Sequence, residues 1–131
     1  MRILVDTNVL FSSLLWPGSK PFLSLVDVME NHELVLTEQN ITELKQIIAR
    51  KAPEHVKEVD SFLKALNYVL IHPSDDVSTD IRDKTDSPIL IAAILNNVDV
   101  IITGDRDFLS LTMKRPICVN PADYLDQIAI H

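Results

Sequence analysis

The side chains in this sequence that are best suited to carry out chemistry are carboxylates that stand at the ends of apolar segments. Asp6 directly follows the apolar run 3–5, and Asp105 and Asp107 follow a second apolar run, 100–102. Carboxylate oxygens, without Cys or a His pair nearby, are ligands that select Mg²⁺ or Mn²⁺ over zinc. If these acids converge, they repel one another unless divalent cations neutralise them. The pattern therefore indicates a site for such cations.

Two further acids stand beside predicted helices. Asp86 comes directly before Ser87-Pro88, and Glu43 lies at the border of the apolar face of another helix. Each acid has an ordinary explanation when it is taken alone: a turn residue for Asp6, a charge at a helix N-terminus for Asp86 and a solvated helix position for Glu43. Their convergence on one edge of the fold is what favours a metal site.

Other reactive residue types give no competing pattern. No Ser-His-Asp or Cys-His arrangement is present. The single cysteine, Cys118, excludes a disulfide framework and a multi-cysteine zinc site, and its apolar surroundings predict an inert core residue. The histidines are scattered without ligand spacing: His32, His55, His72 and His131.

A parallel sheet is expected to position the acids. Short apolar, β-branched runs recur along the chain, and they predict strands at Ile3–Val5, Leu34–Leu36, Tyr68–Ile71, Val100–Ile102 and Ile117–Val119. Their hydrophobicity is continuous rather than alternating, which indicates strands covered on both faces. The carboxyl ends of such strands lie at one edge of the sheet, where ligands bind. Asp6 and Asp105 are expected at that edge.

Helical patterns separate the predicted strands. The expected helices are Pro21–Met29, a helix capped by Thr37 that runs to about Arg50, a helix opened by Pro53, an apolar buried helix capped by Ser87 that runs to Leu95, and Pro121–Ile128. In the third helix, Val56, Val59, Phe62, Leu63 and Leu66 are expected to face inward. This alternation predicts an α/β fold, an α/β/α sandwich formed by residues 1–131 as one domain.

Composition limits the classes of function. The chain of 131 residues carries a net charge of −7, which argues against a protein that coats nucleic acid by bulk electrostatics. It does not exclude a nucleic-acid enzyme, since an active site of carboxylates contributes to that charge. No apolar run approaches the roughly 20 residues of a membrane span. A cytoplasmic location is expected.

Four segments in order resemble the PIN domain family: Val5-Asp6-Thr7-Asn8-Val9-Leu10, Glu43 in a helix, Arg82-Asp83-Lys84-Thr85-Asp86, and Ile102-Thr103-Gly104-Asp105-Arg106-Asp107-Phe108-Leu109. They look most like the bacterial and archaeal PIN proteins that are toxins of toxin–antitoxin systems, relatives of the VapC toxins. The resemblance covers essentially the whole chain. It implies a three-layer sandwich with a five-strand parallel sheet of order 3-2-1-4-5, and an endoribonuclease that depends on Mg²⁺ or Mn²⁺.

The resemblance also implies the site residues. The catalytic, metal-binding quartet would be Asp6, Glu43, Asp86 and Asp105. Asp107 matches a frequent fifth acid of the last motif and would be a further metal ligand. Asn8 and Thr103 match polar positions that hold the carboxylates or the attacking water.

Two of these site residues have a nearby acid that could take the same role. In the third segment the family's principal acid matches Asp86, and whether Asp83 takes part stays open. Glu38 competes with Glu43, but Glu38 stands close to Thr37 and would favour the helix N-terminus, which is a structural role.

Cations are needed to bring RNA to a negative protein. Those that lie within the acidic motifs are candidates for RNA binding: Arg82, Lys84 and Arg106. For Lys45, Arg50 and Lys51, ordinary surface ion pairs are the preferred interpretation.

An apolar segment follows the first motif and consists of Phe11, Leu14, Leu15 and Trp16. Trp16 could stack a base, contribute to a partner surface or pack in the core. The resemblance implies a homodimer, and a possible cognate antitoxin that would occupy the acidic groove with a basic side chain.

Two alternatives stay open. Haloacid-dehalogenase-like phosphatases also begin with an Asp after the first strand, but they need a second Asp where Asn8 stands and an acid where Leu109 stands. The second alternative is a PIN-like scaffold that acts only through its partners, although a scaffold has no reason to tolerate the repulsion among clustered acids.

Overall fold

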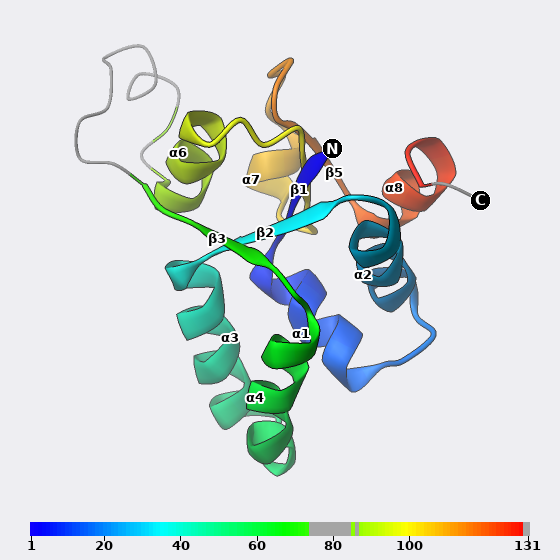
Figure 1. Cartoon of the computed structure of the whole chain (residues 1–131), viewed down its shortest axis with the longest axis vertical. Coiled ribbons are helices and arrows are strands. Elements are labelled where there is room, and N and C mark those ends of the chain that lie inside the picture. Colours follow the sequence, from blue (N-terminus) through cyan, green and yellow to red (C-terminus); the bar gives the residue numbers. More distant parts are fainter. Residues whose placement is uncertain (74–84, 86, 130–131) are drawn as a thin grey trace.

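The computed structural model describes residues 1–73, 85 and 87–129, and its centre is a parallel sheet of five strands (Figure 1). The strands are β1 (Arg2–Val5), β2 (Glu33–Thr37), β3 (Val69–Ile71), β4 (Val100–Ile102) and β5 (Ile117–Val119). Their order is β3-β2-β1-β4-β5, and every neighbouring pair is parallel. The predicted order 3-2-1-4-5 is confirmed.

The register of the central strands fixes which residues meet at the carboxyl edge. Val5 of β1 is opposite Ile102 of β4. The next residues along these two strands, Asp6 and Thr103, therefore leave the sheet side by side. The chain reaches β2 and β3 on one side of β1 before it crosses to β4 and β5 on the other, so the edge above β1 and β4 is the switch point where ligands bind in such sheets.

Helices cover both faces of the sheet, which confirms the three-layer architecture. One face carries α1 (Thr7–Leu15), α2 (Lys20–Asn31), α3 (Glu38–Lys51), α4 (Val56–Ala65) and α8 (Pro121–Gln127). The other carries α6 (Pro88–Leu95) and α7 (Arg106–Leu109). Along β1, Ile3 and Val5 point into the first layer and Leu4 into the second, and all three side chains are completely buried.

The predicted caps begin the predicted helices. The hydroxyl of Thr37 accepts a hydrogen bond from the Asn40 amide at 3.1 Å and starts α3. Ser87 accepts from the Leu90 amide at 3.3 Å and starts α6, an apolar helix that buries Ile89 and Leu90. No helix in the described part of the chain is both long and apolar enough to span a bilayer.

Two helices near the acids were not among the predicted elements. Helix α1 begins directly after Asp6, whose side chain caps it, and it has no clear polar face because its polar residues are spread around the helix. Helix α7 has only four residues and begins after Asp105, whose side chain caps it. In both cases an acid that stands at or shortly after the end of a strand also caps a helix, and this double role is the signal that could have located them.

Some predicted core positions are exposed. Val56 is 45 % exposed because α4 begins there, after the short 3₁₀ helix η1 (Pro53–His55), so the expected inward face of the helix starts only at Val59. Trp16 is 56 % exposed at the end of α1, so packing in the core is wrong for this residue.

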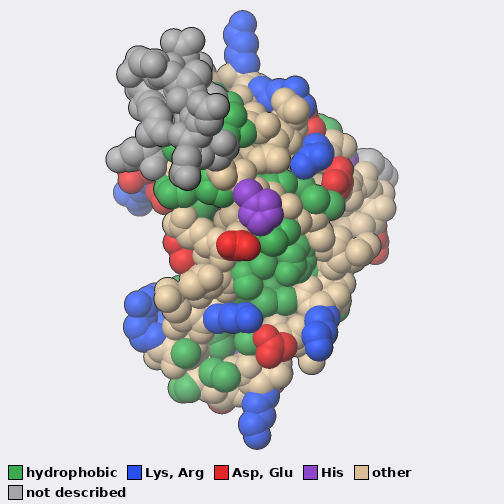
Figure 2. All heavy atoms as spheres, turned by 60° about the vertical axis from the view of Figure 1, so that its left-hand side comes forward, with side chains coloured by type: hydrophobic (Ala, Val, Ile, Leu, Met, Phe, Trp, Pro, Cys, Tyr) green, Lys and Arg blue, Asp and Glu red, His purple; other side chains and the backbone are tan. Residues whose placement is uncertain are grey.

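Strand β3 is an edge strand and is not covered as the sequence predicted. Val69 and Leu70 are 41 % and 37 % exposed. Figure 2 views the molecule from this side and shows apolar side chains in the middle of the surface. The continuous apolar run does not distinguish an edge strand from a central one, since both have the same residue types.

Candidate functional site

Asp6 is the centre of the candidate site. It is 7 % exposed and stands where β1 passes into α1. One carboxylate oxygen accepts a hydrogen bond from the Thr7 amide, and the other accepts from the Thr103 hydroxyl, each at 2.8 Å. Burial raises the pKa of Asp6, the two hydrogen bonds oppose that rise, and the charges of Glu43 and Asp105 add to it. The charges of these three carboxylates therefore repel one another at this site.

Thr103 connects the acids that follow β1 and β4. Its buried hydroxyl donates to Asp6 and accepts from the Asp105 amide at 2.9 Å. Asp105 in turn caps α7 by accepting from the Asp107 amide at 2.8 Å. The short helix therefore fixes the positions of both acids relative to Asp6.

Glu43 reaches the same space from α3. One of its oxygens accepts from the Thr7 hydroxyl at 3.1 Å, and the other accepts from the Gln39 side-chain amide at 2.8 Å. Because Thr7 is the first residue of α1, Glu43 is held directly beside Asp6. Glu38 lies in the first turn of α3, as the sequence predicted, and does not line the pocket described below.

A buried amide supports this contact. Asn40 is completely buried, and its side-chain amide donates to the Thr7 hydroxyl at 3.2 Å. Its carbonyl oxygen accepts from the Thr37 amide at 3.0 Å and from the Thr37 hydroxyl at 2.9 Å. The cap of α3 is thereby connected through Asn40 and Thr7 to Glu43.

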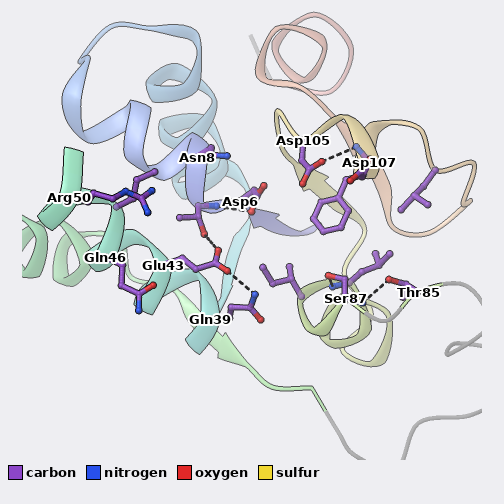
Figure 3. A pocket seen from close by; sticks show the side chains of 16 residues that line it. Asp6, Asn8, Gln39, Glu43, Gln46, Arg50, Thr85, Ser87, Asp105 and Asp107 are labelled. Atoms are coloured by element: carbon purple, nitrogen blue, oxygen red, sulfur yellow. Dashed lines mark hydrogen bonds between the residues drawn. The ribbon is translucent and has the colours of Figure 1, made fainter. Parts of the chain in front are cut away.

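A pocket of about 630 Å³ lies at the carboxyl edge of the sheet, and Asp6, Thr7 and Glu43 are among the residues that line it (Figure 3). Its acidic residues are Asp6, Glu43, Asp105 and Asp107. Figure 3 shows Glu43, Gln46 and Arg50 along α3 on one side, and Asp105 and Asp107 across from them. Ile89 and Phe108 contribute apolar wall.

The other predicted residues are placed as follows. Asn8 is exposed in the first turn of α1 and lines the pocket, without a side-chain hydrogen bond to the described residues. Arg106 is exposed and is not among the residues that line the pocket. Four residues of the third motif, Arg82, Asp83, Lys84 and Asp86, lie outside the described part of the chain.

Several pocket residues were not predicted from the sequence. Thr7, Gln39, Gln46 and Arg50 line the pocket, and Asn40 supports it from below. Three of these residues lie on α3 and could have been found from their spacing, because Gln39, Gln46 and Arg50 share a helix face with Glu43. Nothing in the sequence signals the contact between Asn40 and Thr7, which are 33 residues apart.

The donor chemistry of the pocket suits a hard divalent cation. All of its acidic ligands offer carboxylate oxygen, and repulsion among them would be relieved by a cation. As placed in the described part of the chain, no three His, Cys, Asp or Glu side chains are close enough together to hold an ion. Asp86, the remaining acid of the predicted quartet, is outside that part.

Comparison with known proteins supports the fold. No curated protein matches the sequence. One chain of the crystal structure of VapBC2 from Rickettsia felis, bound to a DNA fragment from their promoter, shares the fold with a TM-score of 0.62 and 16 % identity. The alignment covers 92 % of this chain and 98 % of that one. The family model described as the PIN domain matches residues 2–107, which include β1 to β4 and all four acids of the pocket. A chain matched over that span belongs to the PIN domain family.

Proposed function

We propose that this chain is a Mg²⁺- or Mn²⁺-dependent endoribonuclease that hydrolyses phosphodiester bonds of single-stranded or structured RNA. The observation that carries the proposal is the convergence of Asp6, Glu43, Asp105 and Asp107 on one pocket at the carboxyl edge of the sheet. Family membership supports it, because PIN domains are generally nucleases.

The proposed division of labour follows from the hydrogen bonds. A bound divalent cation supplies charge neutralisation at the phosphate, an activated water and stabilisation of the leaving oxygen. Asp6, Asp86, Asp105 and Asp107 would hold it, and Glu43 would hold a second ion or orient the water. Thr103 fixes the carboxylate of Asp6, and Thr7 with Gln39 fixes that of Glu43, so that the acids are oriented before substrate arrives.

The test compares two acids of one helix. Glu43→Gln is expected to lose RNA cleavage with Mg²⁺ or Mn²⁺, whereas Glu38→Gln, which alters an acid that does not line the pocket, retains it. EDTA is expected to abolish cleavage by the wild type. Folding of each variant is checked by circular dichroism. Retention of full activity by folded Glu43→Gln would remove this residue from the mechanism, and activity only on a small phosphomonoester would favour the phosphatase alternative.

A second comparison decides the alignment of the third motif. Asp86→Asn is expected to abolish cleavage, and Asp83→Asn is expected to cost little. If folded Asp86→Asn is active and Asp83→Asn is dead, the proposed quartet contains the wrong member of this pair.

The proposed biological setting is a toxin–antitoxin pair in the cytoplasm, where RNA substrates are found. It is supported by the fold shared with a chain of the VapBC2 structure. The toxin is proposed to form a homodimer through the exposed Trp16 and its neighbours Phe11, Leu14 and Leu15. The Phe11 and Trp16 rings pack edge to face with centroids 6.3 Å apart, and Phe11 also packs against the core, so it anchors the exposed Trp16.

A further inference from the structure

Helix α3 presents a polar row to the pocket that extends beyond the acids. Gln39, Glu43, Gln46 and Arg50 are spaced by four, three and four residues, so they share one face of the helix. All four line the pocket. Among the described residues that line it, Arg50 is the only cation, at the end of the row farthest from the start of the helix.

Arg50 is also uncommitted within the described part of the chain. Its guanidinium forms no ion pair or hydrogen bond with a described residue, although four carboxylates line the same pocket. Lys45 on the same helix is different, because it pairs with Asp60 at 3.6 Å. A free, planar guanidinium at an open pocket is suited to bidentate binding of a phosphate.

The position of Arg50 separates it from the cleavage site. It lies seven residues after Glu43, which corresponds to about 10 Å along the helix axis. Both side chains lean toward the helix N-terminus, and the longer arginine makes up only part of this separation at its end. A phosphate held among Asp6, Glu43 and Asp105 is therefore not the phosphate that Arg50 faces.

We infer that Arg50 binds a phosphate that flanks the one to be cleaved, so that the substrate is a single strand of several nucleotides laid along α3. The inference rests on the proposed nuclease function. A pocket of about 630 Å³ has room for more than a metal and one phosphate. A chain of net charge −7 also needs a local cation to hold a polyanion beside four acids.

The experiment measures binding and cleavage separately. Fluorescence anisotropy follows a labelled ten-nucleotide oligouridylate in Ca²⁺, which offers a hard cation to the carboxylates. Arg50→Gln is expected to weaken binding about tenfold, as for loss of one charge-assisted hydrogen-bonded contact. The negative slope of log affinity against log salt is also expected to become shallower by about 0.7, the contribution of one phosphate contact in a single strand. Lys51→Gln, which removes a neighbouring cation that does not line the pocket, is the matched control and should change neither quantity.

Cleavage kinetics with Mn²⁺ give the second readout. Arg50→Gln is expected to raise KM for the ten-nucleotide substrate with little change in kcat, and to leave kcat/KM for the dinucleotide UpU unchanged. Equal binding and equal salt slopes for Arg50→Gln and wild type would overturn the inference, as would the absence of binding by the wild type. If the wild type binds in an Arg50-dependent way but cleaves no RNA, the nuclease proposal fails while the phosphate contact stands.

Discussion

Replacement of the buried Asn40 should destabilise the protein more than any exposed change on the same helix. Asn40→Ala removes three hydrogen bonds: those from the Thr37 amide, from the Thr37 hydroxyl and to the Thr7 hydroxyl. A net worth of about 1 kcal/mol for each gives a loss of about 3 kcal/mol in the free energy of unfolding. Because Thr37 is only 2 % exposed, water does not readily replace these partners. For a chain of this size the melting temperature should fall by roughly 10 °C.

The assay is urea denaturation followed by circular dichroism in EDTA, with Gln46→Ala as the control. Gln46 is an exposed amide on α3 without a hydrogen bond to the described residues, so its removal should cost less than about 0.5 kcal/mol. Equal losses for the two variants would refute the reasoning, because Asn40 would then contribute no more than a solvated side chain. Asn40→Ala should also lower kcat, since Thr7 would lose the partner that helps to fix it beside Glu43.

Three other outcomes are expected. The pKa of Asp6 is raised in the fold, so ionisation of this carboxyl destabilises the metal-free protein as the pH rises above 3.8, the ordinary pKa of the group. Asp6→Asn should therefore raise the melting temperature in EDTA at pH 7 but not below pH 3.8. An equal difference in melting temperature at both pH values would contradict this. Cys118 is only partly buried, and this burial, with a smaller contribution from the charge of Asp6, raises its pKa to about 11. At pH 8 a thiol reagent should therefore modify the native protein far more slowly than the denatured protein, and equal rates would contradict this. Light scattering at micromolar concentration should give twice the chain mass of 14.8 kDa for the wild type and the single mass for Trp16→Glu, and a monomeric wild type would remove the dimer.

The sheet and most helices were accessible from the sequence because local signals agree with the tertiary structure. Apolar runs, Thr37 and Ser87 as caps and Pro53 at a helix start all act over a few residues. Where the prediction failed, the deciding interaction is tertiary. No local sequence feature identifies β3 as an edge strand. The polar residues of α1 are spread around the helix, so that its sequence shows no helical periodicity.

The acids of the site were predictable for a different reason than their supports. Asp6 directly follows β1 and Asp105 comes three residues after β4, at strand ends that a parallel sheet brings to one edge, so their convergence follows from the topology. The supporting contacts do not, because Thr7 meets Asn40 only through the packing of α1 against α3. Arg50 was assigned to an ordinary surface ion pair, but the face of α3 that it shares with Glu43 turns it toward the pocket.

The acids at the carboxyl edge are proposed to act as one metal-binding unit. The most direct measurement is the rate of single-stranded RNA cleavage with Mn²⁺ for Asp6→Asn, Asp105→Asn and the double variant, each shown to be folded. Residues that act as a unit are strongly non-additive. We expect each single replacement to remove nearly the whole rate and the double replacement to remove little more. Normal cleavage by both folded single variants would contradict the account.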